Sequence, residues 1–187
     1  SAELARSSTS GSDAIFAFMP GGMGVRLVKQ FANAGLSDSM KFMSVFTTDE
    51  TTLPGQKDAA VGFLAAGTWA PDMPNDANLA FAKAFEAKYG YIPGSYAMQA
   101  YDTANLIDSA VAKTGGDLSD KNAVRAALKE ADFTSLRGDF SFNNNHYPVQ
   151  SFHMLNVVKR DDGKFQTSFV RTIKADYADS FHQDCKM

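Results

Sequence analysis

The sequence has few of the features that mark the commoner functional classes. Its 187 residues include one cysteine, Cys185, so no disulfide can form within the chain. An odd cysteine in a secreted protein suggests a partner outside the chain. No apolar run approaches the ~20 residues that a membrane-spanning helix needs. The formal net charge is −3, so there is no basic footprint of a nucleic-acid-binding protein.

Glycines occur in a tight turn at Pro20–Gly24, but the nucleotide-binding motifs are missing. A phosphate-binding loop needs Lys-Ser or Lys-Thr after its glycines, and neither follows here. A dinucleotide fingerprint starting at Gly22 would need a glycine at Leu27. The glycines therefore either turn the chain tightly or let a ligand approach the backbone, since glycine permits both.

Metal and catalytic motifs are also missing. A calcium-binding frame that starts at Asp139 fails, because its sixth position is Asn144 and its twelfth is Gln150. The three histidines are widely spaced, and the sequence has neither HExxH nor GxSxG. We expect no metal, no cofactor and no catalytic residues, and thus a protein that is not an enzyme.

The hydrophobic content of 44% is sufficient for a packed core, and the segment Asp13–Leu36 has the clearest pattern. An apolar run at Ala14–Met19 predicts a strand, Pro20–Gly22 a turn, and the spacing of the following apolar residues a helix that ends at Gly35. This unit places a strand end beside a helix N-terminus, where backbone N–H groups favour an anion. The segment therefore predicts a binding site for a small anionic solute.

The rest of the chain continues this pattern and then changes. Strands are predicted at Lys41–Phe46 and Gly62–Thr68 with a short helix between them, which gives β-α-β-α-β and a parallel sheet of the α/β class. A proline-rich crossover follows. Three helices are then predicted: one at Leu79–Tyr89, one from an N-cap at Ser95 to Gly115, and one that follows a cap at Ser119 or Asp120. Three strands are predicted after them, at Leu136–Phe142, Gln150–Arg160 and Lys164–Arg171.

Three runs carry a resemblance to a known family. They are FAKAFEAKYGYIPGSYAMQAYDTANLIDSA at Phe81–Ala110, NAVRAALKEADF at Asn122–Phe133 and RGDFSFNNNHYPVQSFHMLNVV at Arg137–Val158. With the segment Asp13–Leu36 they resemble the type I periplasmic solute-binding proteins, the receptors of branched-chain amino acid ABC importers. The similarity extends from about Ser12 to Lys174. It departs from the family at Asn144-Asn145, where relatives often have Asn-Gly.

The resemblance implies a fold of two Rossmann-like, parallel-sheet lobes joined by a hinge. The family chain is about twice as long, so this sequence resembles its second half only. Residues 1–70 would belong to the second lobe, 71–146 would return to the first lobe, and 147–187 would return to the second. The first residues, Ser1–Arg6, have no signal-peptide pattern, so we expect the chain to begin mature or to be cut from something longer.

The resemblance also implies partners and a location. They are a small carboxylate ligand bound between the lobes, the membrane permease of an ABC importer, the N-terminal half of the same protein, and the periplasm. Amino-acid binders of this family carry an acid near the end of the strand placed at Lys41–Phe46, where Phe46 stands here. An aromatic or otherwise apolar carboxylate is therefore the first expectation. A branched-chain amino acid is a close alternative, and the ligand-binding ectodomain of a receptor is another.

The candidate ligand residues lie where the chain enters or leaves an element. Glycines allow close approach of a ligand, and aromatic side chains are typical of pocket walls. Tyr96 also matches a family position that packs on the ligand. The predicted ligand-binding residues are Pro20, Gly21, Phe46, Thr47, Trp69 and Tyr96.

Overall fold

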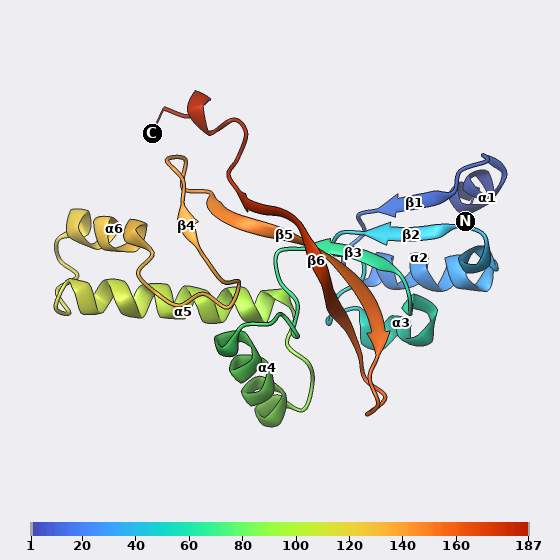
Figure 1. Ribbon diagram of the computed structural model, residues 1–187, viewed down its shortest axis with the longest axis horizontal. Helices are drawn as coiled ribbons and strands as arrows, with labels where there is room; N and C mark the ends of the chain where they lie inside the picture. Colours follow the sequence, from blue (N-terminus) through green and yellow to red (C-terminus); the bar gives the residue numbers. More distant parts are fainter. Residues whose placement is uncertain (1, 187) are drawn as a thin grey trace. The chain divides into compact units, whose positions relative to one another are not determined.

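The computed structural model describes residues 2–186, which divide into two units (Figure 1). Unit 1 consists of the chain up to Asp72 together with His153–Arg171, and unit 2 of Met73–Phe152 together with the chain from Thr172 onward. The chain thus passes between the units three times. The units differ from the expected segments, because residues 147–152 and 172–186 group with unit 2. The assignment of segments to the two lobes of the family stays a prediction.

Unit 1 is built on three parallel strands, as the β-α-β-α-β pattern predicted. They are β1 (Ala14–Ala17), β2 (Lys41–Ser44) and β3 (Leu64–Gly67), in that spatial order. The long strand β5 (Pro148–Lys159) pairs antiparallel with β3, so the sheet is mixed. The remaining elements of unit 1 are α1 (Ala2–Thr9), α2 (Gly22–Asn33), the 3₁₀ turn η1 (Leu36–Asp38), α3 (Leu53–Gln56) and the 3₁₀ turn η2 (Lys57–Ala60).

Helix α2 covers one face of this sheet because its apolar residues recur at helical spacing. Val28 and Phe31 are fully buried. The ring of Phe31 packs edge-on against Phe42 of β2 at 5.2 Å and against Phe63 at 5.6 Å, and these two rings stack at 4.6 Å. Burying each such ring stabilises the fold by about 1.5–3 kcal/mol. This cluster fixes α2, and with it the turn at Pro20–Gly22, relative to the strand ends.

Unit 2 is mainly helical. It contains α4 (Asp76–Tyr89), α5 (Ser95–Lys113), α6 (Lys121–Glu130), the short strand β4 (Ser141–Phe142) paired with β5, and the 3₁₀ turn η3 (His182–Asp184). Strand β6 (Phe165–Tyr177) pairs with β5 and, like β5, has residues in both units. Asp120, one of the two predicted caps, is the N-cap of α6. The N-cap of α5 is Gly94 and Ser95 is its first residue, so that prediction was wrong by one position.

The strand predicted at Leu136–Phe142 is reduced to two residues because a buried carboxylate holds its first part. Asp102 of α5 accepts hydrogen bonds from Ser135 Oγ (2.6 Å), Leu136 N (2.9 Å) and Arg137 Nε (3.2 Å). Backbone held in this way cannot join a strand ladder. Within residues 2–186 no helix is both long enough and apolar enough to cross a membrane.

Candidate ligand site

The candidate site of unit 1 lies at one edge of its sheet. Strands β1, β2 and β3 are parallel, so the segments that follow them emerge at the same edge, where ligands of open α/β sheets gather. Five of the six predicted residues belong to these segments, and the sixth belongs to unit 2. Those of unit 1 are Pro20, Gly21, Phe46, Thr47 and Trp69, and that of unit 2 is Tyr96.

The side chain of Thr47, in the segment after β2, forms hydrogen bonds with the end of β1 and with the segment that follows it. Its hydroxyl accepts a hydrogen bond from Met19 N (2.8 Å) and donates to Ala17 O (3.1 Å), and Val45 N also donates to Ala17 O (3.3 Å). The Thr47 side chain is 0% exposed. The structure therefore gives its hydroxyl partners within unit 1, and its role at the edge is to hold two strand ends together.

Gly24, in the first turn of α2, is the second fastening point. A Cβ at this position would lie 2.1 Å from the Met19 carbonyl oxygen. Real Cβ atoms do not approach oxygen so closely, so only glycine lets the helix sit against the segment after β1. The glycine-rich turn thus has a packing role at Gly24, while Gly21 supplies the turn itself with a φ of 69°.

Phe46 has an unusual backbone for a bulky residue. Its φ is 55°, in the left-handed region, which costs a non-glycine residue about 1–3 kcal/mol and persists only where the surroundings impose it. Its half-buried ring meets the ring of Phe18 edge-to-face, with centroids 6.3 Å apart and planes at 83°. Phe18 was not among the predicted residues. The apolar run Ala14–Met19 placed it inside the predicted strand, but β1 ends at Ala17, so Phe18 lies at the same edge as Phe46, and no local signal marked it as exposed.

The two acids near Phe46, Asp49 and Glu50, accept hydrogen bonds from other residues of unit 1. Asp49 Oδ1 accepts hydrogen bonds from Thr51 N (2.9 Å), Thr51 Oγ1 (2.6 Å) and Thr52 N (3.1 Å). Glu50 Oε1 accepts from both N and Oγ1 of Thr167 on β6, each at 2.7 Å. Both carboxylates are therefore committed to contacts within the protein.

Burial raises the pKa of Glu50 to about 7, although the hydrogen bonds from Thr167 oppose that change. A raised carboxyl pKa means that the folded state holds its proton more tightly than the unfolded state. Glu50 therefore leaves the stability undiminished below the ordinary carboxyl pKa of 4.5 and lowers it progressively as the pH rises to about 7.

Glu50→Gln should remove this pH dependence while keeping both hydrogen bonds from Thr167, because an amide oxygen also accepts. Between pH 4.5 and 8 the variant should gain up to about 3 kcal/mol in unfolding free energy relative to the parent protein. Urea unfolding of the parent protein and of the Glu50→Gln variant at several pH values measures the difference in unfolding free energy. Asp161→Asn, at an exposed hairpin carboxylate, is the control and should leave the profile unchanged. A parent-like pH profile for Glu50→Gln would contradict the assignment.

Trp69 and Asp72 complete the edge after β3. The Trp69 side chain is 1% exposed, so it forms part of the interior here. Asp72 accepts hydrogen bonds from Ser168 Oγ (2.5 Å) and Phe169 N (2.8 Å) of β6. Glu50 and Asp72 together accept hydrogen bonds from three consecutive residues of β6, Thr167, Ser168 and Phe169. The three acids in the segments after β2 and β3 thus all bind groups of unit 1.

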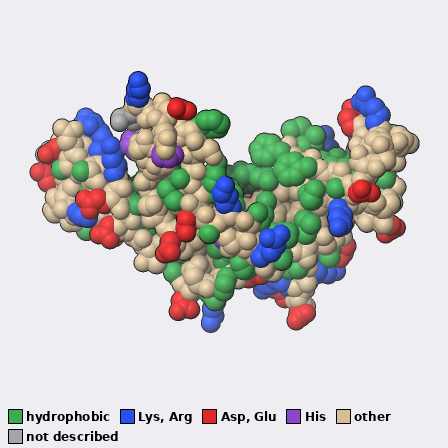
Figure 2. Space-filling model, turned by 45° about the horizontal axis from the view of Figure 1, so that its top comes forward, with side chains coloured by type: hydrophobic (Ala, Val, Ile, Leu, Met, Phe, Trp, Pro, Cys, Tyr) green, Lys and Arg blue, Asp and Glu red, His purple; other side chains and the backbone are tan. Residues whose placement is uncertain are grey.

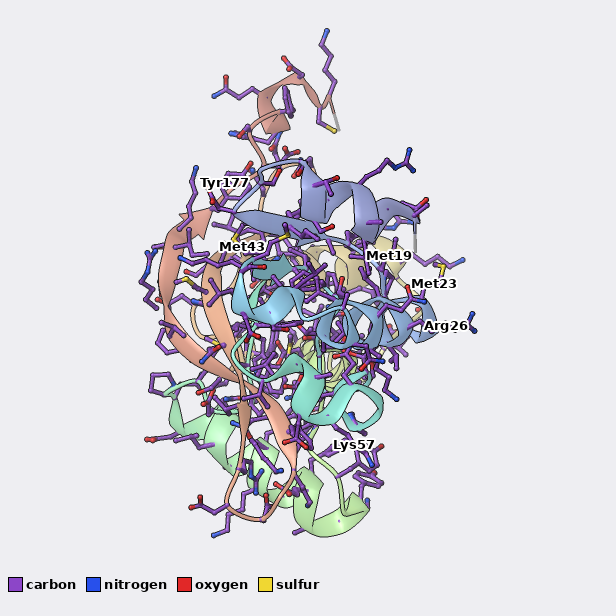
Figure 3. All side chains as sticks on the ribbon, turned by 90° about the vertical axis from the view of Figure 1, so that its right-hand side faces the viewer. Met19, Met23, Arg26, Met43, Lys57 and Tyr177 are labelled. Carbon is purple, nitrogen blue, oxygen red and sulfur yellow. The ribbon has the colours of Figure 1, made fainter. Side chains whose placement is uncertain are left out.

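Helix α2 begins at this edge without a side-chain cap. Its N-cap is Gly21, whose lack of a side chain leaves the first turn uncapped by any side chain. The amide groups of an uncapped first turn carry a partial positive charge. Met19 precedes the turn and Met23 belongs to the first turn of α2, and both side chains are labelled in Figure 3. The start of α2 is therefore a place of positive potential bordered by apolar side chains.

Apolar side chains are also exposed near this edge. Phe16, Phe18, Met19 and Met23 are all exposed, with Phe18 at 63%. Figure 2 shows apolar side chains gathered on part of the surface of unit 1. In unit 2, Tyr96 at the start of α5 is 56% exposed. Exposed apolar groups that cluster mark binding surfaces more often than single ones do.

Metal binding has no support in the described residues, which contain no group of three histidine, cysteine or acidic side chains that could hold an ion. The asparagine turn has another use. Asn144 Nδ2 donates to His182 O (2.8 Å), and Asn145 Nδ2 donates to Asp179 Oδ2 (2.7 Å). The turn therefore fastens the C-terminal segment of unit 2.

The sequence profile of the periplasmic binding protein family matches residues 1–164. The chain belongs to this family. Its members bind solutes and are not enzymes, which agrees with the expectation drawn from the missing catalytic motifs. The family resemblance and the α/β fold class are both confirmed.

Solved structures of ABC transporter solute-binding proteins are similar to this periplasmic binding protein. One from R. palustris, in complex with benzoate, is 29% identical, with a TM-score of 0.84, over 96% of this chain and 48% of that one. Another, from Rhodopseudomonas palustris BisB5 with 3,4-dihydroxybenzoic acid, is 31% identical, with a TM-score of 0.83, over 94% and 49%.

A leucine-binding protein from Thermotoga maritima is more distant, at 17% identity and a TM-score of 0.74 over 92% of this chain and 48% of that one, so it supports the fold alone. The chain spans about half the length of the solved structures that it matches. No protein with a curated description matches it.

Proposed function

We propose that the chain is the second half of a periplasmic solute-binding subunit of an ABC importer, and that the full-length protein binds a small aromatic carboxylate between two lobes without converting it. This proposal is supported by the residues at the edge of the unit 1 sheet where the segments after β1, β2 and β3 emerge. A phenylalanine ring stands at the end of β2, and each neighbouring acid already binds groups of the protein.

This chemistry disfavours an amino acid. The ammonium group of leucine or valine needs a carboxylate partner when it is removed from water, because burying an unpaired charge is costly. Asp49 and Glu50 accept hydrogen bonds within unit 1 at 2.6–3.1 Å, and Glu50 is also partly neutral near pH 7. An aromatic acid has no ammonium group, so it avoids this cost.

The same edge suits a ring and an anion. Aromatic rings prefer edge-to-face or offset contacts, and Phe18 and Phe46 already meet edge-to-face. The uncapped start of α2 offers amide groups and a partial positive charge to a carboxylate. Further contacts to the carboxylate would come from the N-terminal half of the protein. Relatives at about 30% identity that were crystallised with benzoate and dihydroxybenzoate support this choice of ligand class.

The proposed partnership with an N-terminal half is supported by unit 1 itself. Strand β1 is last in the strand order, so one of its edges has no neighbouring strand among residues 2–186. Phe16 of β1 is also exposed, whereas parallel sheets are normally covered on both faces. An additional strand from the other half of the protein would pair with the open edge of β1, and a helical layer would cover Phe16. The second proposed partner is the membrane permease of the importer.

A thermal-shift panel on the full-length protein tests the ligand class. Benzoate and 4-hydroxybenzoate should raise the melting temperature, while leucine and valine should leave it unchanged, because a ligand that binds only the folded state stabilises it. At a ligand concentration of 100 times Kd, the stabilisation would be about 2.7 kcal/mol.

The reverse ranking, with leucine or valine giving the largest shift and the aromatic acids none, would replace this proposal with amino-acid binding. Phe46→Glu provides the matched variant. It restores a carboxylate at the strand end, so it should weaken the response to benzoate and create a response to leucine.

A further inference from the structure

We propose that Phe18 is a specificity-determining residue of the ligand site, and that it forms with Phe46 an aromatic wall that selects a planar ring. This inference rests on the proposed function and deepens it. The aromatic wall is defined here as the side chains of Phe18 and Phe46, which follow β1 and β2 and meet edge-to-face with planes at 83°.

The backbone on both sides of Phe18 is fixed. Ala17 O accepts hydrogen bonds from Thr47 Oγ1 and Val45 N, and Met19 N donates to Thr47 Oγ1. The Met19 carbonyl is also packed against Gly24. The backbone of Phe18 is thus held in place by both of its neighbours before any ligand arrives. A site whose backbone is already in place loses less conformational entropy on binding, which is the advantage of preorganisation.

Phe18 nevertheless does not add its ring to the core of unit 1. Its exposed fraction is 63%, although a buried phenylalanine would stabilise the fold substantially. The neighbouring Thr47 and Ala17 are buried, so the exposure belongs to this side chain and not to a loose segment. An exposed ring on a backbone that is held on both sides, beside a Phe46 in a left-handed backbone conformation, is suited to contact an apolar ligand group.

The geometry of the pair favours an aromatic group over an aliphatic one. In an edge-to-face pair one ring offers its electron-poor edge to the electron-rich face of the other. A third planar ring can repeat this contact against the aromatic wall, whereas a saturated ring of similar size has neither a flat face nor a polarised edge. The aromatic wall should therefore distinguish benzoate from cyclohexanecarboxylate, which carries the same charge.

Calorimetric titration of the full-length protein with both acids tests the inference. We expect the parent protein to prefer benzoate, and Phe18→Ala to weaken benzoate binding about tenfold, equivalent to about 1.4 kcal/mol. The same variant should lower the benzoate-to-cyclohexanecarboxylate preference. Phe18→Leu, which keeps the apolar volume, should bind both acids alike. Phe181→Ala is the control, since Phe181 is also an exposed phenylalanine, at 74%, and lies in the C-terminal segment outside the aromatic wall.

The outcomes separate this inference from the proposed function. If the parent protein binds neither acid, the proposed function fails. If it binds benzoate but Phe18→Ala and Phe18→Leu keep the parent preference between the two acids, the proposed function stands and the role of Phe18 is refuted. A loss of both affinities in Phe18→Ala without a change in their ratio would also refute it, because that result indicates a structural role only.

Discussion

Replacing Gly24 by alanine should destabilise the full-length protein by about 3 kcal/mol, the upper end of the range for overpacked sites. The added Cβ would lie 2.1 Å from the Met19 carbonyl oxygen and 3.1 Å from Thr47 Cγ2. A backbone oxygen cannot move aside as a flexible side chain can, so α2 or the segment after β1 must shift. The measurement is the change in unfolding free energy from urea titration.

Gly22→Ala is the matched control, two residues earlier in the same glycine-rich turn. A Cβ at Gly22 meets no atom within 4 Å, and its backbone is not in the left-handed region. The control should therefore leave the stability nearly unchanged. Equal effects of the two substitutions would show that the close contact at Gly24 does not restrain the fold.

Removing the Asp102 carboxylate should have a comparable effect in unit 2. The Asp102 side chain is 2% exposed and pairs with Arg137, which is 11% exposed, at 3.2 Å. Burial lowers the pKa of Arg137, and Asp102 counteracts this. Asp102→Ala would leave Arg137 Nε, Ser135 Oγ and Leu136 N without their acceptor. Breaking a buried ion pair by removing one partner costs about 3–5 kcal/mol.

Asp108→Ala is the control for this substitution, because Asp108 is exposed and lies on the same helix. It should change the unfolding free energy by less than about 0.5 kcal/mol, as is usual for surface positions. If Asp102→Ala were as mild as its control, Arg137 would have found another acceptor. Its contact with Gln150 Oε1 at 2.8 Å is the alternative that such a result would point to.

The sequence predicted the elements whose signals are local. The apolar run at Ala14–Met19, the turn and the spacing of Val28 and Phe31 sufficed for β1 and α2. The cap at Asp120 and the hairpin turn at residues 161–163 were also found, because capping and turn chemistry depend on a few adjacent residues. The parallel order of β1, β2 and β3 followed from their alternation with helices.

What the sequence did not predict depends on contacts between distant residues. The strand expected at Leu136–Phe142 is shortened by Asp102, which is more than thirty positions away. The hydrogen bond from Thr167 to Glu50 joins positions 117 residues apart, so no local sequence pattern predicts it. Phe18 was missed because the apolar run Ala14–Met19 placed it inside the predicted strand, where an apolar residue is ordinarily part of the core, whereas β1 ends at Ala17. Its exposure emerges only once both strand ends are placed.

The left-handed backbone at Phe46 has a consequence for how this position changes over evolutionary time. Substitution by glycine or asparagine would relieve the backbone conformation, so selection for stability alone would favour those residues over phenylalanine. A lineage that retains a ring here accepts a cost in stability, which we expect only where the side chain is selected for its function. Among related proteins, the residue at this one strand end should report the class of solute better than overall identity does.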